Sequence, residues 1–272
     1  MNFNVENGQN AVPSRPRRPK SKYRTVIIIA TAIAVFAVLV TLSVFLFLPE
    51  IAEDTDSGAT IDYVSDGKLV IYVDAGHGYI DPGADSEYLG DLSEKDINLS
   101  VALRLADYLR SYGAEVKMTR TSDIPPEGED PEAYKLTPQM RAEIVNGDAD
   151  ADVFVSVHCD SFPSNPDVRG LRVHYDKNNT KDTPKLAKKI AASATDRLDF
   201  YGMPEAKLIS YGSTSAGIYV LRNITVPSVL VELGFLTNTS DAYLMQDERW
   251  ADDAAHAIAD GMAEFFGLSQ AS

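Results

Sequence analysis

The chain has 272 residues, of which 25 are basic and 40 are acidic, so its formal net charge at pH 7 is −15. The length is sufficient for one large domain or two small ones with a sizeable hydrophobic core. The first 50 residues carry a net charge of +4, and the other 222 carry −19. We expect no nucleic-acid partner, because so acidic a body has few positive charges to displace the counterions of a phosphate backbone.

Residues 25–48 are 24 consecutive uncharged residues, most of them aliphatic or Phe. As a helix this run is about 36 Å long, enough to cross a hydrocarbon core of about 30 Å. A cleaved signal peptide is the alternative, but it has an apolar stretch of only about 7–15 residues and a small-residue cleavage site. The run here continues into Leu-Pro-Glu-Ile without such a site. We therefore predict one transmembrane helix at 25–48.

All the basic residues of the N-terminal region precede this span; they are Arg15, Arg17, Arg18, Lys20, Lys22 and Arg24. The positive-inside rule then places residues 1–24 in the cytoplasm, as a disordered tail, and the rest of the chain outside the cell membrane. The acidic segment 49–66 is interpreted as a stalk, followed by one extracytoplasmic catalytic domain at 67–272. The single cysteine, Cys159, excludes an intrachain disulfide.

Hydrophobic periodicity beyond the stalk predicts alternating strands and helices. Strands are expected at 68–74, 115–119, 152–157, 170–175, 218–221 and 228–232. Helices are expected at 93–112, 136–146, 184–199 and 250–266. Ser93 and Asp96 are a plausible capping pair for the first helix, and Gly113 is a natural stop. The fold class is therefore α/β, a single domain with a mixed, largely parallel sheet covered by helices and preceded by the transmembrane helix.

Four chemically capable residues follow a strand, end a strand or begin a helix: His77, Glu94, His158 and Glu232. Ligands of open α/β sheets gather outside the carboxyl ends of the strands, so these side chains can converge despite their separation in sequence. Two histidines and one carboxylate leave a tetrahedral Zn²⁺ one open position, as a catalytic site requires. A second carboxylate that does not bind the metal can accept a proton from water.

Each of the four residues also has a simpler explanation. A Gly-His-Gly sequence is often only a turn, a glutamate in the first helical turn suits the helix dipole, and a histidine at a strand end can be a hydrogen-bonded core residue. Glu232 is the strongest candidate, because it lies in an aliphatic run where a buried carboxylate needs a partner. The residues alone predict a metal-dependent hydrolase.

At these residues the sequence resembles the zinc-dependent N-acetylmuramoyl-L-alanine amidases of the type-3 amidase family. The resemblance covers about 68–268, essentially the whole extracytoplasmic domain. The matching stretches are VDAGHGYIDPGA (73–84), SEKDINL (93–99), KMTR (117–120), LTPQMRAEIVN (136–146), FVSVHCDS (154–161) and VPSVLVELGFLTN (226–238). Their occurrence in family order makes the match specific.

The resemblance implies that His77, Glu94 and His158 are the zinc ligands and that Glu232 is the catalytic glutamate. It implies a peptidoglycan hydrolase that cleaves the amide between N-acetylmuramic acid and L-alanine of the stem peptide. Zinc would polarise the carbonyl and activate water, and Glu232 would pass the proton of that water to the leaving amine. The family fold, a mixed sheet covered by helices, agrees with the pattern of elements.

Two positions depart from the family pattern. Ala75 stands where proline is usual, a difference expected to affect the backbone more than catalysis. Asp160 stands where the family usually has asparagine, which adds a negative charge beside the metal and affects substrate fit more than metal binding.

The remaining candidates are interpreted as structural. Cys159 and His158 are adjacent strand residues, which point to opposite faces, so Cys159 is expected to be a small buried residue and not a nucleophile. His174 and His256 are expected to be structural or surface residues; Arg120 and Arg141 match family positions, where buried salt bridges explain them as well as substrate contacts do.

Two other functions stay open at this stage. A zinc peptidase or carboxypeptidase would cut within the stem peptide, whereas an amidase would release a free amine on L-alanine. A catalytically silent wall-binding or regulatory domain would have no need for the four polar residues.

Overall fold

The computed structural model describes residues 67–88, 90, 93–212 and 218–269. The predicted tail at 1–24, transmembrane helix at 25–48 and stalk at 49–66 lie outside these residues. Within the described part of the chain, no helix combines the length and hydrophobicity that crossing a membrane requires.

The described residues contain six strands and six α-helices. The strands are β1 Val70–Ala75, β2 Glu115–Met118, β3 Val153–Asp160, β4 Arg172–Asp176, β5 Lys207–Tyr211 and β6 Ser228–Phe235. The helices are α2 Glu94–Ser111, α3 Pro138–Asn146, α4 Thr183–Leu198, α5 Tyr219–Asn223, α6 Thr239–Leu244 and α7 Glu248–Phe266. A short 3-10 helix at Asp199–Tyr201 follows α4.

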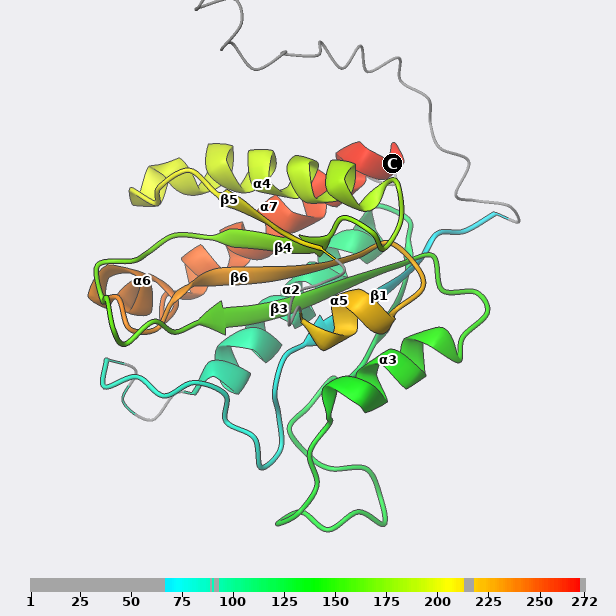
Figure 1. Ribbon diagram of the computed structural model, residues 1–272, viewed down its shortest axis with the longest axis horizontal. Helices are drawn as coiled ribbons and strands as arrows, with labels where there is room; N and C mark the ends of the chain where they lie inside the picture. The colour runs from blue at the N-terminus through cyan, green and yellow to red at the C-terminus, as the bar shows by residue number, and fades with distance from the viewer. Residues whose placement is uncertain (1–66, 89, 91–92, 213–217, 270–272) are drawn as a thin grey trace, which may run out of the picture. The chain divides into compact units, whose positions relative to one another are not determined.

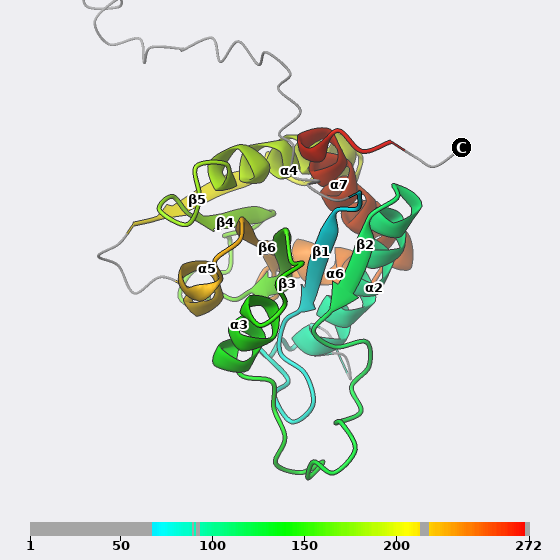
Figure 2. The same cartoon turned by 90° about the vertical axis from the view of Figure 1, so that its right-hand side faces the viewer.

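The strands form one mixed sheet in the order β2-β1-β3-β6-β4-β5. Every neighbouring pair is parallel except β4 and β6, which are antiparallel. Helices α2, α4 and α7 cover one face of the sheet, and α3 and α5 cover the other (Figures 1 and 2). The predicted fold class, a single α/β domain with a largely parallel sheet covered by helices, is confirmed.

Each face of the sheet has its own hydrophobic core. The larger core joins β1, β3, β4 and β6 to α2, α4 and α7, and the fully buried Trp250 belongs to it. The smaller core packs Tyr72, Phe154 and Leu230 of the sheet against Val220 and Leu221 of α5. Because both faces are covered, the central strands are nearly continuous apolar runs, as their sequences suggested.

The sequence pattern located most elements to within two or three residues, with three exceptions. The strand expected at 218–221 is wrong: Tyr219–Asn223 is the helix α5. Four apolar residues fit a buried strand and a short buried helix equally well, and here Val220 and Leu221 face the smaller core. The edge strand β5 and the short helix α6 were not predicted.

The carboxyl ends of β1, β3 and β6 meet at one edge of the sheet. Because β1, β3 and β6 are parallel neighbours, residues that follow or end them are held side by side. Strands β3 and β6 are longer than predicted, so His158 lies within β3 and not after it, and Glu232 lies within β6 and not at its end.

Candidate metal centre and active site

The structure brings His77, Glu94, His158 and Glu232 to this edge of the sheet. His77 lies in the turn after β1, Glu94 is the first residue of α2, and His158 and Glu232 are directly opposite each other on β3 and β6. Four residues chosen from sequence therefore form one cluster, as expected.

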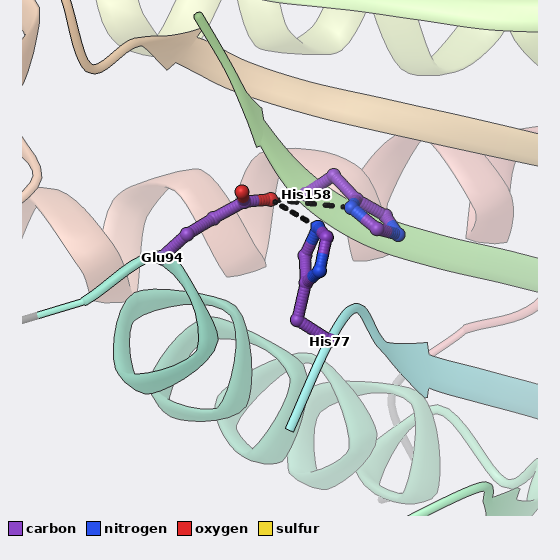
Figure 3. A group of neighbouring side chains, drawn as sticks. All are labelled: His77, Glu94 and His158. Atoms are coloured by element: carbon purple, nitrogen blue, oxygen red, sulfur yellow. Dashed lines mark hydrogen bonds and ion pairs between the residues drawn. The ribbon is translucent and has the colours of Figure 1, made fainter. Parts of the chain in front are cut away.

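The three predicted metal ligands converge on one point (Figure 3). The Oε1 atom of Glu94 lies 3.2 Å from Nε2 of His77 and 3.2 Å from Nδ1 of His158. One ligand atom from each residue lies within 4.8 Å of the others. A group of two imidazoles and one carboxylate with this spacing could hold a metal ion.

The carboxylate of Glu94 is buried and fixed by three donors. Its Oε1 accepts hydrogen bonds from the backbone N–H of Cys159 at 3.0 Å and from Nδ2 of Asn98 at 3.1 Å. Its Oε2 accepts one from the backbone N–H of Ala84 at 2.7 Å. Burial raises the pKa of Glu94, but the hydrogen bonds and charges of His158 and His77 outweigh it and hold the pKa well below its usual value. Glu94 is therefore an ionised ligand candidate at neutral pH.

Asp81 orients the ring of His77. Its Oδ2 lies 3.0 Å from Nδ1 of His77, and its Oδ1 accepts a hydrogen bond from the backbone N–H of Gly83. In the tautomer with its proton on Nδ1, His77 donates to Asp81 and turns the lone pair of Nε2 toward Glu94. Burial lowers the pKa of His77, but Glu94 and Asp81 raise it more, so its net pKa is raised.

The cluster fits a metal ion on the chemistry of its donors. Nε2 of His77 and Nδ1 of His158 each lie 3.2 Å from the ionised Oε1 of Glu94, so two imidazole nitrogens and one anionic oxygen face one point. The buried carboxylate favours a positive charge at this point, and the raised pKa of His77 reflects the same preference for a proton. Zn²⁺ bound by His nitrogen and Glu oxygen satisfies the same preference.

Two buried arginines fix the turn that carries His77. Arg141 donates to the carbonyl oxygens of Ala75 at 2.9 Å and His77 at 2.6 Å, and forms an ion pair with the fully buried Asp74. Arg120 donates to the carbonyl oxygens of Ala75 and Gly76, each at 3.0 Å. These contacts satisfy carbonyls at the end of β1, which gives both arginines a structural role. Arg141 also lines the candidate pocket, so a substrate contact stays an alternative for this residue.

Two glycines let the ligands approach. A Cβ atom on Gly76 would lie 2.2 Å from the ring of His158, and one on Gly83 would lie 2.4 Å from the carboxylate of Glu94. Gly83 also has a φ of +78°. Larger residues at these positions would displace the candidate ligands.

Glu232 lies beside the three candidate metal ligands but forms no hydrogen bond with any of them. Its Oε2 is buried and has no hydrogen-bond partner among the described residues. Burial, together with the negative charges of Asp160 and Glu94, raises the pKa of Glu232 well above its usual value, and Arg172 opposes this only in part. A carboxyl with a raised pKa is suited to accept and return a proton near neutral pH.

A pocket of about 260 Å³ opens over these groups. Its polar lining includes His77, His158, Glu232 and Arg141, and Leu136 and Val220 belong to an apolar wall formed by α5 and the segment before α3. The site therefore has the form of a substrate cleft, with a few convergent polar groups beside apolar surface.

Cys159 is structural, as predicted. It is buried in the larger core, on the opposite face from His158, and its Sγ lies 3.5 Å from Oδ1 of Asn98. Burial raises the pKa of the thiol well above its usual value, and nearby carboxylates add to the effect, so no thiolate nucleophile forms.

Neither of the other two histidines is a member of the cluster. His256 lies on α7, where its ring stacks on Tyr108. His174 is buried on β4, with Nδ1 at 2.8 Å from the hydroxyl of Tyr211 and Nε2 without a partner among the described residues. Burial, reinforced by the charges of Arg172 and His158, lowers the pKa of His174 to about 4.

Sequence reasoning missed the residues that support the four candidates, chiefly Asp81, Asn98 and Arg172. Asp81 and Asn98 each lie four residues after a predicted ligand, His77 and Glu94. For Asn98 this spacing on a helix was a usable signal, because residues i and i+4 share a helix face. Arg172 gave none, because its position beside Glu232 depends on the antiparallel pairing of β4 and β6.

Comparison with known proteins agrees with this geometry. The profile of the Amidase_3 family, described as N-acetylmuramoyl-L-alanine amidase, matches residues 71–264. The germination-specific N-acetylmuramoyl-L-alanine amidase of Bacillus subtilis is 34% identical over 203 residues, which cover 74% of this chain and 80% of that protein.

Two solved structures are similar at comparable levels. The N-acetylmuramoyl-L-alanine amidase AmiC2 of Nostoc punctiforme is 31% identical with a TM-score of 0.61. The CwlD amidase of Clostridioides difficile, solved in complex with the GerS lipoprotein, is 32% identical with a TM-score of 0.62. Each match covers 74% of this chain and 99% of the other chain.

Replacing Asp81 with asparagine is expected to weaken metal binding about 10- to 100-fold, because the ring of His77 loses its charged orienting partner. Titration of the metal-free protein with Zn²⁺, followed by calorimetry, measures this directly. Asp85→Asn is the matched control, since Asp85 is an exposed aspartate of the same loop. Equal affinity of D81N and D85N for zinc would contradict the orienting role.

The buried neutral His174 makes stability depend on pH. Its pKa of about 4 in the folded protein lies below the unfolded value of 6.5, so the unfolded chain binds more protons between these two pH values. Stability is expected to fall by roughly 3 kcal/mol as the pH decreases through this window, and no further below it. Urea unfolding of the metal-free protein at pH 7 and pH 4.5 should show a smaller difference for His174→Phe than for the wild type. An unchanged difference would be inconsistent with a buried neutral imidazole.

Proposed function

We propose, from the premise that the chain belongs to the Amidase_3 family of N-acetylmuramoyl-L-alanine amidases, that it cleaves peptidoglycan with a zinc centre and one glutamate base. The enzyme is an N-acetylmuramoyl-L-alanine amidase, and its substrate is peptidoglycan. The observation that carries the mechanism is the convergence of His77, Glu94 and His158 beside Glu232, whose buried Oε2 has no partner among the described residues.

His77, Glu94 and His158 are the proposed zinc ligands. They provide two neutral nitrogen donors and one anionic oxygen, a set that Zn²⁺ accepts with a position left open for catalysis. A bound zinc ion supplies Lewis-acid polarisation of the scissile carbonyl. The three donors of Glu94 and the carboxylate of Asp81 keep two of these ligands oriented before substrate arrives.

Glu232 is the proposed general base and then general acid. It accepts a proton from the attacking water and donates it to the nitrogen of L-alanine as the amide bond breaks. Its raised pKa supports both steps, because a carboxyl of ordinary pKa would release the proton to solvent and not to the leaving amine. The apolar wall of the pocket keeps this carboxyl away from bulk water.

The alternative functions are disfavoured on physical grounds. A silent wall-binding domain would bear the cost of burying the unpaired Oε2 of Glu232 without any use for it. A peptidase acting within the stem peptide would use the same groups, so only the reaction products separate it from an amidase.

The N-terminal region is proposed to attach the enzyme to the cell membrane. Residues 1–24 form the cytoplasmic tail in this proposal, 25–48 a single transmembrane helix and 49–66 a stalk, with the catalytic domain at 67–272 outside. The uncharged run and the basic residues before it support this arrangement.

Purified peptidoglycan incubated with the enzyme is expected to yield stem peptides with a free L-alanine amine, identified by mass spectrometry. Glu232→Gln should lower this release 10²- to 10⁴-fold and retain zinc, because it removes proton transfer and no ligand. His77→Ala should lose both the release and the zinc measured by metal analysis.

Equal release by the wild type, E232Q and H77A would refute the mechanism. Fragments cut within the stem peptide would instead favour the peptidase. A folded wild-type protein with neither zinc nor release would favour the silent domain.

The full-length chain expressed in bacteria is expected to sediment with membranes and to resist extraction by high salt, because the run at 25–48 is held by lipid. A variant lacking residues 1–50 should remain in the soluble fraction. Protease added outside spheroplasts should digest the catalytic domain; protection of that domain, or salt-extractable full-length chain, would refute the proposed anchor or its orientation.

A further inference from the structure

A second pocket, of about 350 Å³, lies at the same end of the strands as the active site. Three basic side chains and one acidic side chain line it: Arg169, Arg172, Lys207 and Asp167. The body of the protein beyond residue 50 has twice as many acidic as basic residues, so a pocket with this balance of charge is unusual on its surface.

The register of the sheet connects this pocket to the catalytic residues. His158 on β3 is opposite Glu232 on β6, Glu232 is opposite Arg172 on β4, and Arg172 is opposite Lys207 on β5. Residues directly opposite one another on neighbouring strands point to the same face. The four side chains therefore form one row across the sheet, from the candidate metal ligand His158 to the outermost strand, β5.

The spacing of this row shows which residue of a bound peptide can contact the second pocket. Adjacent strands are about 4.8 Å apart, so the backbone of Lys207 lies about 10 Å from that of Glu232. An extended peptide advances about 3.3 Å per residue. A peptide cleaved beside Glu232 and running along the row would bring its second or third residue to Lys207.

Two of the three cations are already engaged by protein carboxylates. Arg169 Nε lies 3.1 Å from Oδ1 of the buried Asp241. The Nη1 atom of Arg172 lies 3.8 Å from Oδ2 of Asp160, a long contact that leaves its buried Nε without a hydrogen-bond partner among the described residues.

Lys207 differs from both arginines. Among the residues that the structure describes, none forms a hydrogen bond or ion pair with its ammonium group, and the residue is exposed. An uncompensated cation at the end of the row is a binding group for an anion that arrives with the substrate.

We propose that Lys207, supported by Arg172, binds a carboxylate carried by the second or third residue of the peptide whose L-alanine amide is cleaved. The inference rests on the proposed function, since it takes the scissile bond to lie beside Glu232. The chemical class follows from the bond that is cleaved: the lactyl carboxyl of the sugar is consumed in the amide, so a free carboxylate on this side of the bond must belong to the peptide. The subsite selects acidic stem peptides and orients them along β6, β4 and β5.

The test uses the full chain and three synthetic N-acetylmuramoyl tripeptides that begin with L-alanine. One has a free carboxylate on the second residue, one has it on the third, and one has carboxamides at both. The wild type should show a lower KM for at least one acidic peptide than for the neutral one. Lys207→Gln should raise that KM about fivefold to tenfold with kcat within about twofold, and should leave the neutral peptide unaffected.

Two further variants separate charge from structure. Lys207→Arg should retain the preference for the acidic peptide, because it keeps the cation. Lys188→Gln is the matched control, since Lys188 is an exposed lysine of α4 outside the pocket lining, and it should behave as the wild type.

The outcomes are distinct. No preference of the wild type for an acidic peptide, or equal effects of K207Q on acidic and neutral peptides, would overturn the subsite. Failure of the wild type to cleave any of the three at the L-alanine amide would instead overturn the proposed function.

Discussion

The turn between β1 and α2 depends on one buried ion pair, between Asp74 and Arg141. Asp74 also accepts hydrogen bonds from Thr119 of the segment after β2 and from Ser156 of β3. Arg141 in turn donates to the carbonyl oxygens of Ala75 and His77. His77 has a φ of +58°. Breaking such a pair would leave a buried charge, so the strained turn is stabilised by the interior of the sheet.

Two glutamates a short distance apart have opposite electrostatic environments. Glu94 is held by three hydrogen-bond donors and two imidazoles, which keep its pKa low. Glu232 has no donor for its buried Oε2, and burial together with the charges of other carboxylates raises its pKa. Environments that separate the pKa values of two carboxyls are how an enzyme assigns one to hold a cation and the other to move a proton.

Much of this organisation was accessible from sequence, because local pattern reflects local burial. The apolar run before His77 and the capping pair before α2 gave the first strand and helix to within two residues. The pattern failed where the run was short, as at α5, and where the strand lies at an exposed edge, as at β5, whose residues are at most half-buried. Neither error moved a candidate ligand, since none of the ligands lies on those elements.

The sequence by itself determined the class of fold, the family resemblance and the four candidate residues, because residue types at strand and helix ends carry that information locally. Only the tertiary structure decided which groups support them. Asp81 turns toward His77 because the loop after β1 folds back on itself, and Arg172 stands beside Glu232 because β4 alone runs antiparallel to its neighbour β6. Pairing between distant strands fixes these contacts, and no local periodicity encodes a register between segments some 60 residues apart in the chain.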